Sequence, residues 1–394
     1  MRFFSSESVT EGHPDKMCDQ ISDALLDAFL GGDTQSRCAI EALSAGNMIH
    51  VAGEVTSQTQ VDVERVVRDL VRSIGYTEQS FGIDADGFEW HLSLGQQSPD
   101  IAHGVNSALE QREGGSADPY DSLGAGDQGI MFGFATTETE VLMPMPLWLA
   151  HRFAQQLSIA RKTGLIDYFR PDGKTQVTIG YDGGKPVTLN TLVISTQHSP
   201  GVGHEEIEAD LQKHVIAPVL GMVDLDATQT RYLINPSGPF VTGGPDGDAG
   251  LTGRKIIVDS YGGSARHGGG AFSGKDPTKV DRSAAYALRW VAKNVVGAGL
   301  ADKAEIQVSY AIGTAHPVSI FVETFGTEHV AQDRIEKAIS EVFDLRPKAI
   351  IEALDLLTTS YLPTAAYGHF GRSDVDFPWE RLNRVEELRQ ASGL

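Results

Sequence analysis

The chain has little of what defines disulfide-rich, zinc-binding and membrane proteins. Its 394 residues include only two cysteines, Cys18 and Cys38, without C-x-x-C or Cys/His spacing, so neither a disulfide framework nor a zinc site is expected. No apolar run approaches the ~18 residues that a membrane helix needs. The opening residues 1–7 lack the apolar core of a signal peptide. We therefore expect a protein of the reducing cytoplasm.

Basic residues are also scarce. Lysine and arginine total 32 against 53 aspartates and glutamates, a net charge of −21, which disfavours nucleic acid or an anionic membrane as a partner. The balance of charge reverses between positions 254 and 282, where basic residues outnumber acidic ones. The basic residues are Arg254, Lys255, Arg266, Lys275, Lys279 and Arg282, and the acidic residues are Asp259, Asp276 and Asp281. This basic island predicts a small, strongly anionic ligand; the alternative is a solvated charged face.

A glycine-rich loop lies inside the basic island. Residues 268–276 read GGGAFSGKD, and from Gly269 they fit the phosphate-loop pattern G-x-x-x-x-G-K until Asp276 replaces the usual Ser or Thr. Glycines let backbone N–H groups converge on an anion, and Lys275 supplies a fixed positive charge. The preceding segment is turn-rich rather than strand-like, so we predict polyphosphate binding without the fold of a P-loop nucleoside triphosphatase.

Three segments of the chain share one pattern: a β-rich run, a polar turn and an amphipathic helix. The runs and their helices are 48–56 with 61–74, 189–196 with 205–219, and 317–324 with 331–343. Long β-rich stretches between single helices argue against a strictly alternating parallel sheet. The predicted fold is α/β of the α+β type: three similar domains with pseudo-threefold symmetry, whose mixed or antiparallel sheets carry helices on one face. Chance recurrence of a common motif is the alternative.

The predicted domains are residues 1–100, 127–243 and 244–394, with a mobile lid or linker at 101–126. The longest irregular stretch, residues 98–126, contains few apolar residues. A loop of this length inside a compact domain is usually functional or disordered. An active-site lid and a plain surface insertion both fit its composition.

Acidic residues recur beside glycines in the predicted loops. In GHPDK at 12–16, Pro14 suits the first turn of a helix, which places His13 and Asp15 at the positive end, where phosphates and their metals bind. The other loop acids are Asp127 (in GAGDQG at 124–129), Asp248 and Asp281. Such carboxylates suit Mg²⁺, which takes one or two of them together with phosphate oxygens. The alternative is that Asp15 only offsets the helix dipole and His13 only caps the helix.

Together these motifs resemble the signatures of the S-adenosylmethionine synthetase (methionine adenosyltransferase) family over essentially the whole chain. They are GHPDK at 12–16, GAGDQG at 124–129, LTGRKIIVD at 251–259, GGGAFSGKDPTKVDRSAAY at 268–286 and TAAYGHFG at 364–371. The resemblance implies that the sulfur of L-methionine displaces triphosphate from the ribose C5′ of ATP, and that the triphosphate is then hydrolysed to phosphate and pyrophosphate. A thioether has no proton to lose, so fixed cations and Mg²⁺ matter more than a general base.

The resemblance implies a role for each matching residue. The catalytic residues are His13, Asp127, Arg254 and Lys275. The ATP contacts are His13, Asp172, Gly173, Lys174, Phe240, Asp248, Arg254, Lys255, Ala271 and Lys275, and the methionine contacts are Glu54, Gln97, Asp248 and Lys279. Two Mg²⁺ ions per site are implied at Asp15 and Asp281, and one K⁺ per subunit at Glu41. The implied assembly is a cytoplasmic homotetramer, a dimer of dimers with active sites at the dimer interface.

The sequence departs from the family pattern at two places, and it leaves two alternative functions. Pro239 precedes Phe240 where the family usually carries Arg, and the lid region is longer than in the shortest bacterial members. A phosphotransferase using the P-loop-like string would release ADP, which the synthetase does not. A non-catalytic nucleotide-binding subunit would be expected to lack a charged site residue.

Overall fold

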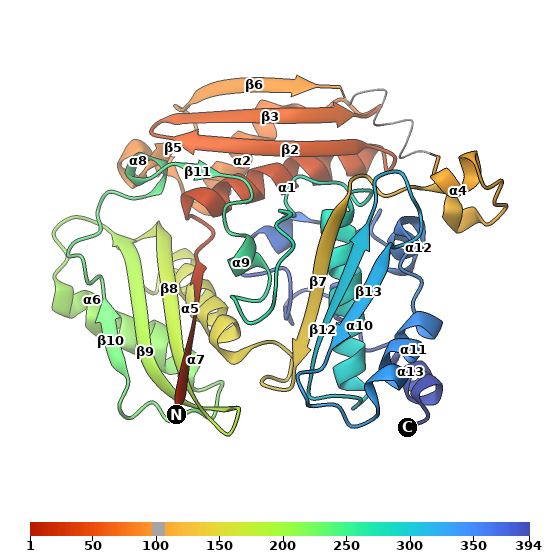
Figure 1. The fold of residues 1–394 in the computed structure, drawn as a ribbon. Helices are drawn as coiled ribbons and strands as arrows, with labels where there is room; N and C mark the ends of the chain where they lie inside the picture. The colour runs from red at the N-terminus through yellow and green to blue at the C-terminus, as the bar shows by residue number, and fades with distance from the viewer. Residues whose placement is uncertain (97–106) are drawn as a thin grey trace.

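The computed structural model describes residues 1–96 and 107–394, and most of its strands form three sheets (Figure 1). Their orders are β11-β2-β3-β6, β1-β8-β9-β10 and β13-β12-β7. In Figure 1 the long helix α1 (Pro14–Gly32) lies below the sheet that contains β2, β3 and β6, whereas α5 (Met145–Lys162) and α10 (Val280–Gly297) lie behind the other two sheets. The predicted mixed α/β fold of three units, with helices against one face of each sheet, is confirmed.

The first sheet is an antiparallel hairpin extended by a parallel strand. Its strands are β2 (Arg37–Ala45), β3 (Met48–Thr56), β6 (Glu89–Gly95) and β11 (Gly250–Leu251), beside a small ribbon of β4 (Thr77–Glu78) and β5 (Ile83–Asp84). Helix α2 (Val63–Ile74) connects β3 to its parallel neighbour β6. Asp62 caps the start of α2 through the Arg65 amide, and Gly75 ends it in the left-handed region.

The second sheet repeats this hairpin, helix and parallel strand. Its strands are β1 (Arg2–Val9), β8 (Phe169–Asp182), β9 (Lys185–His198) and β10 (Arg231–Ile234). The connection from β9 to parallel β10 comprises α6 (His204–Leu211), a π turn at Gln212–Ile216 and α7 (Ala217–Leu220). A separate apolar core forms where α5 packs on this sheet.

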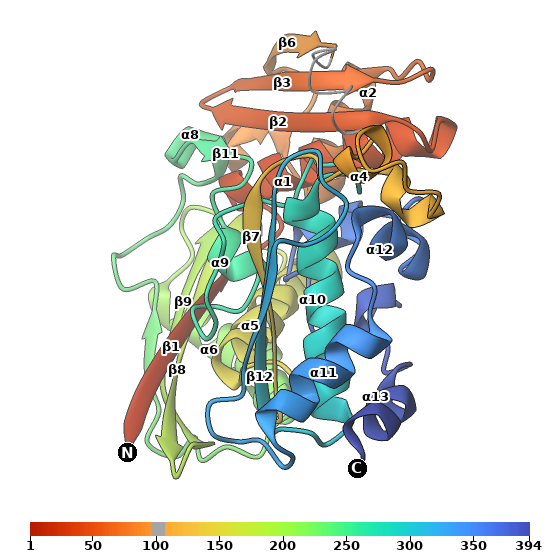
Figure 2. The same cartoon turned by 45° about the vertical axis from the view of Figure 1, so that its right-hand side comes forward.

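The third sheet is an antiparallel hairpin with an extra strand, and α10 crosses behind it (Figure 2). Its strands are β7 (Gly129–Thr136), β12 (Lys303–Tyr310) and β13 (Ser319–Glu323). The remaining helices are α4 (Leu109–Arg112), α8 (Gly244–Gly247), α9 (Ile256–Asp259), α11 (Gln332–Val342), α12 (Pro347–Ala353) and α13 (Val385–Ser392), with 3₁₀ turns at Gln79–Phe81, Pro119–Ser122, Leu362–Ala365 and Pro378–Glu380. The three predicted strand–turn–helix segments are confirmed as β3–α2, β9–α6 and β13–α11.

The three sheets exchange their outer strands in a cycle. Strand β1 precedes α1 but pairs with β8 of the second sheet, and β7 precedes α5 but pairs with β12 of the third. Strand β11 precedes α10 and pairs with β2 of the first. All three pairings are antiparallel. The loops that leave β1 and β11 therefore cross between units.

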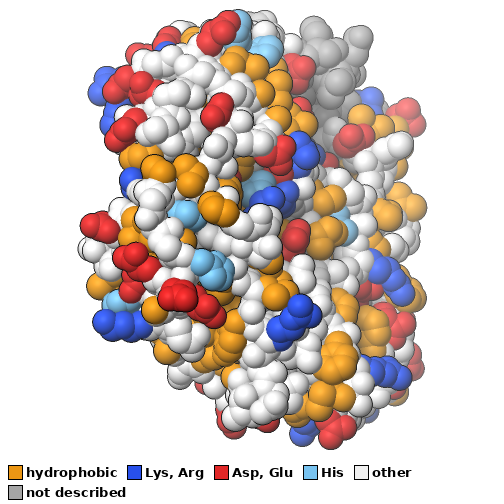
Figure 3. Space-filling view, turned by 90° about the vertical axis from the view of Figure 1, so that its left-hand side faces the viewer, with side chains coloured by type: hydrophobic (Ala, Val, Ile, Leu, Met, Phe, Trp, Pro, Cys, Tyr) orange, Lys and Arg blue, Asp and Glu red, His pale blue; other side chains and the backbone are white. Residues whose placement is uncertain are grey.

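Figure 3 shows basic side chains scattered among acidic and apolar ones on the face in view. Within residues 1–96 and 107–394, no helix is long and apolar enough to span a membrane.

Candidate functional site

The predicted site residues fall mainly into two groups in the folded chain. One group surrounds the start of α1, and we call it the α1 group: His13, Asp15, Asp172, Gly173, Lys174, Asp248, Arg254 and Lys255. The other lies at the start of α10, and we call it the α10 group: Glu54, Asp127, Lys275, Lys279 and Asp281. Among the described residues, no hydrogen bond or ion pair joins one group directly to the other.

His13 is a buried, neutral donor at the start of α1. Its Nδ1 accepts the Asp15 amide at 3.1 Å, so the proton is assigned to Nε2. Burial, followed by the charges of Lys255 and Lys174, lowers the pKa of His13 to about 3. The imidazole therefore stays uncharged at neutral pH and can donate one hydrogen bond from Nε2 to an anion.

Asp15 joins the start of α1 to the turn after β11. Its Oδ1 accepts the Leu251 amide at 3.0 Å, and its Oδ2 accepts Lys255 Nζ at 2.6 Å. Arg254 Nε lies 3.6 Å from Oδ1. Burial opposes ionisation, but the hydrogen bond and charge of Lys255 outweigh it and lower the pKa of Asp15. The start of α1 thus carries an ionised carboxylate between two fixed cations.

Strand β8 pairs with the exchanged strand β1, which leads into α1. This pairing brings Asp172, Gly173 and Lys174 close to the start of α1. The Thr10 amide donates to the Gly173 carbonyl at 3.0 Å. Asp172 Oδ2 accepts the Gly244 amide at 2.9 Å, whereas the buried Oδ1 has no hydrogen-bond partner. Burial raises the pKa of Asp172 to about 6.

Phe240 and Pro239 lie on a loop tied to the end of β9. The Phe240 amide donates to His198 Nε2 at 3.1 Å, and the His198 amide donates to the Phe240 carbonyl at 2.9 Å. Pro239 helps to line a cavity of about 340 Å³ together with His198 and His204. The loop is held by its backbone, so its position does not depend on an arginine at 239.

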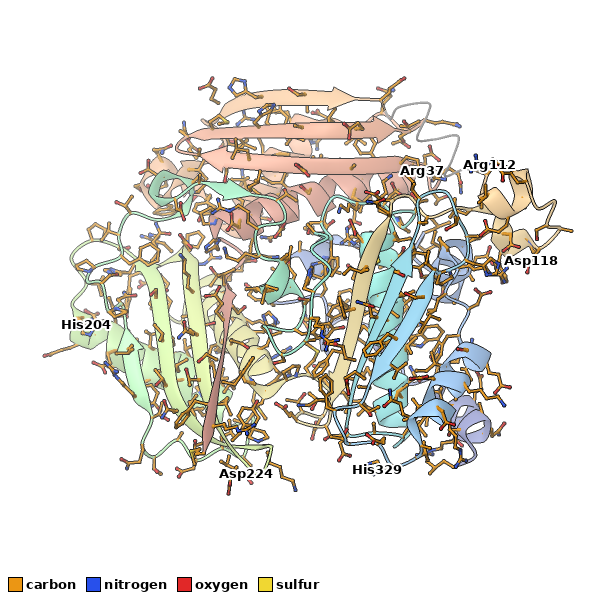
Figure 4. The ribbon with its side chains drawn as sticks, in the orientation of Figure 1. Arg37, Arg112, Asp118, His204, Asp224 and His329 are labelled. Atoms are coloured by element: carbon orange, nitrogen blue, oxygen red, sulfur yellow. The ribbon has the colours of Figure 1, made fainter. Side chains whose placement is uncertain are left out.

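The α10 group lines a cleft of about 470 Å³ between β2, β3 and the start of α10. The lining residues are Arg37, Ala39, Glu54, Gln96, Gly126, Asp127, Lys275, Lys279, Val280 and Asp281. Figure 4 shows Arg37 at the start of β2, above the upper ends of β7 and β12. Lys275 Nζ lies 2.7 Å from Asp281 Oδ2, and Lys279 Nζ lies 2.7 Å from Asp276 Oδ2. The cleft thus presents two lysines, each beside a carboxylate.

Three backbone amides at the end of the glycine-rich loop are hydrogen-bonded within the protein. The Gly274 amide donates to Asp23 Oδ1 at 2.9 Å, and the Asp276 amide donates to the Cys38 carbonyl at 3.2 Å. The Lys275 amide donates to the Phe272 carbonyl at 3.3 Å. These three amides are satisfied within the protein, so they are not free to bind an anion.

Asp276, at the position of the usual P-loop Ser or Thr, is a structural residue. Its carboxylate is buried and accepts the Cys38 amide at 2.7 Å and the Thr278 amide at 2.9 Å. The bond to the Cys38 amide attaches the loop to β2, and an aspartate has no hydroxyl group of the kind that holds Mg²⁺ in a P-loop. The P-loop-like string therefore belongs to a different local structure.

The loop also touches both groups through its small residues. A Cβ atom on Gly253 would lie 2.6 Å from the Ala271 methyl group, and one on Gly270 would lie 2.3 Å from Asp281 Cγ. Ala271 therefore lies against the turn that carries Arg254. Any side chain at either glycine would displace the neighbouring group.

The predicted metal ligands are not gathered in one place. Asp15 belongs to the α1 group and Asp281 to the α10 group, while Glu41 is exposed on β2 opposite Ala52. Within the described residues, no cluster of three or more His, Cys, Asp or Glu side chains could hold a metal. Gln97 lies outside the described residues.

The predicted lid, residues 98–126, is only partly within the described residues. Its described part, from 107 onwards, is docked on the third unit. Glu110 accepts the Ala315 amide at 3.0 Å, and Arg346 NH1 donates to Asp118 at 2.9 Å and to Asp121 at 2.8 Å. Figure 4 shows Arg112 and Asp118 on this outlying segment.

Sequence reasoning missed the acids that hold the two groups in place. Asp19 and Asp23 on α1 are fully buried and accept amides from the Gly253 turn and the Gly274 loop. The sequence carries a signal for them, because Asp15, Asp19, Asp23 and Asp27 recur every four residues. That spacing puts them on one face of a helix.

Three family models match the chain: S-adenosylmethionine synthetase N-terminal domain over residues 1–99, central domain over 122–240 and C-terminal domain over 242–381. The S-adenosylmethionine synthase of Leifsonia xyli subsp. xyli is 59% identical over 394 residues, covering 100% of this chain and 99% of the relative. That of Mycolicibacterium gilvum is 59% identical over 397 residues, covering 99% of each. That of Clostridium botulinum is 57% identical over 389 residues, again covering 99% of each.

Proposed function

We propose the roles below from one premise: the chain belongs to the S-adenosylmethionine synthetase family, and it is a transferase that makes S-adenosylmethionine from ATP and L-methionine. The observation that carries the chemistry is neutral His13 beside the cations Lys255 and Lys174. A site of fixed cations and an uncharged donor suits a leaving polyphosphate. The phosphotransferase and the non-catalytic subunit are not favoured.

In the proposed reaction the methionine sulfur forms a bond to ribose C5′ while the C5′–oxygen bond breaks. The electron pair leaves on the triphosphate, and the sulfur becomes a sulfonium cation. His13 Nε2 donates to the polyphosphate near the breaking bond, and Lys275, Arg254 and Lys255 hold its charge without reorganising. Hydrolysis of the triphosphate to phosphate and pyrophosphate follows. Glu54 and Asp248 bind methionine, and Asp127 supports the sulfonium.

The donor chemistry fits Mg²⁺ and K⁺. Asp15 is kept ionised by Lys255, and Asp281 is a partly exposed carboxylate beside Lys275. Mg²⁺ takes one or two carboxylates with phosphate oxygens, so one ion at each aspartate is the proposed arrangement. Bound Mg²⁺ would neutralise charge on the triphosphate. The exposed Glu41 is the proposed K⁺ ligand.

We also propose that each active site combines the α1 group of one subunit with the α10 group of its partner. The separation of Asp15 from Asp281 within one chain supports this, because both act on one triphosphate. The proposed assembly is a cytoplasmic homotetramer built as a dimer of dimers. The proposed domains are residues 1–100, 127–243 and 244–394, with a lid at 101–126.

Subunit mixing tests the composite site. Lys255→Met damages the α1 group and Lys275→Met the α10 group, so a heterodimer of the two has one doubly damaged site and one intact site. We expect it to recover about half the wild-type activity per dimer, while each parent stays nearly inactive. A heterodimer of Lys255→Met with Arg254→Met is the control, because both changes affect the α1 group and no site is restored. Equal inactivity of both heterodimers would contradict the composite site.

A further inference from the structure

Helix α1 carries a ladder of four carboxylates, one every four residues, and together they accept backbone amides from three segments that lie far along the chain. Asp15 accepts Leu251 N at 3.0 Å, Asp19 accepts Gly253 N at 2.8 Å, Asp23 accepts Gly274 N at 2.9 Å, and Asp27 accepts Tyr361 N at 2.7 Å and Leu362 N at 3.0 Å. One helix face thus anchors the turn of the α1 group, the loop of the α10 group and a C-terminal segment.

Asp19 fixes the turn that carries the α1-group cations. It accepts the amide of Gly253, the residue just before Arg254, and it pairs with Lys16 at 2.9 Å. Gly253 has φ +81°, and Ala271 lies where a side chain would be. Lys16 also pairs with Asp259, at the far end of the same segment. The turn is held to α1 at both ends.

Asp23 fixes the loop that carries Lys275. It accepts the Gly274 amide and forms a bidentate pair with Arg282 at 2.7 and 2.8 Å. The same guanidinium donates to the Phe272 carbonyl at 3.1 Å and to the Lys275 carbonyl at 3.3 Å. The backbone of Lys275 is therefore held on both sides by a pair that is almost fully buried.

Burying these carboxylates is costly, and apolar residues can often replace a buried ion pair without loss of stability. Apolar residues cannot accept the amides of Gly253 and Gly274. The contribution that needs a carboxylate is thus the placement of the two loops.

We propose that Asp19 and Asp23 are positioning residues: through them α1 sets the places of Arg254 and Lys275 without either aspartate touching a substrate. The proposal rests on the proposed function for the roles of those two cations. It predicts loss of turnover rather than of ground-state binding, because a misplaced charge is felt most where negative charge develops.

The test compares three substitutions on one helix face. Asp19→Ala and Asp23→Ala should each lower kcat about 100-fold, with a much smaller change in KM for ATP. Asp27→Ala is the matched control, because it also removes amide acceptors but anchors a segment without a predicted site residue. An Asp27→Ala loss as large as the other two, or an Asp19→Ala kcat close to that of the parent, would overturn the proposal.

Two further measurements separate positioning from folding. Asp19→Asn keeps an oxygen for the Gly253 amide but loses the charge facing Lys16, so it should regain part of the turnover lost in Asp19→Ala. Asp23→Ala strands the buried Arg282 guanidinium and can fail to fold, so the Asp19 series decides on its own. No recovery in Asp19→Asn would overturn the anchoring role.

Amide hydrogen exchange tests whether the aspartates anchor these segments, and it does not depend on an activity assay. Asp19→Ala should speed exchange in residues 250–256, and Asp27→Ala in 358–364. Faster exchange with unchanged turnover would overturn positioning, and unchanged exchange would overturn anchoring. A wild-type protein that forms no S-adenosylmethionine would instead refute the proposed function, with the exchange pattern still reporting on the ladder.

Discussion

Replacing Lys275 by methionine should abolish most turnover and leave folding nearly intact. The lysine is only 26% exposed in its side chain and lies 2.7 Å from Asp281 at the cleft. Losing one fixed donor to developing negative charge costs about 3 kcal/mol, which corresponds to a rate about 100-fold lower. A partly exposed ion pair contributes about 0–1 kcal/mol to stability, so the free energy of unfolding should change little.

The assay is the initial rate of S-adenosylmethionine formation, measured beside urea unfolding of the same sample. Lys303→Met is the matched control, because Lys303 lies 3.8 Å from Glu138, is 34% exposed and belongs to neither group. Its rate should stay near that of the parent. A Lys275→Met rate within a factor of about two of the parent, or an equal loss in Lys303→Met, would refute the role of Lys275.

Three other predictions follow from single contacts. Asp15→Asn should raise the Mg²⁺ concentration for half-maximal activity, since an amide is a poorer ligand for a hard cation; an unchanged Mg²⁺ titration would contradict it. The pKa of His13 is lowered from 6.5 to about 3, so between these values the unfolded chain binds a proton that the folded chain does not. The free energy of unfolding should therefore fall as the pH drops below 6.5. His13→Gln should flatten this pH dependence, measured by unfolding from about pH 4 to 7. Arg346→Ala should speed tryptic cleavage after Arg112, because it frees Asp118; methionine with a non-hydrolysable ATP analogue should slow cleavage in the parent, and equal rates throughout would favour a passive insertion.

Local patterns predicted the elements well because their causes are local. The apolar spacing in α2 reflects the burial of Val67, Val71 and Ile74, and its ends follow from Asp62 and Gly75. The start of α1 also followed from GHPDK, since Pro14 occupies the first turn and His13 caps it. These features need only a few neighbouring residues.

The structural features that the sequence did not predict depend on partners far along the chain. The role of Asp276 depends on Cys38, 238 positions away, and the Gly274 amide is taken by Asp23, 251 positions away. A phosphate-loop pattern carries no information about such partners. The exchange of β1, β7 and β11 is likewise set by pairing between units, so it had no local signal.

The most direct test of the central claim is the identity of the products. The protein is incubated with ATP, L-methionine, Mg²⁺ and K⁺, and the nucleosides and phosphates are identified by mass. We predict S-adenosylmethionine with phosphate and pyrophosphate, without ADP, because the whole triphosphate leaves from C5′. Release of ADP with a phosphorylated product, or ATP left unchanged, would contradict the account.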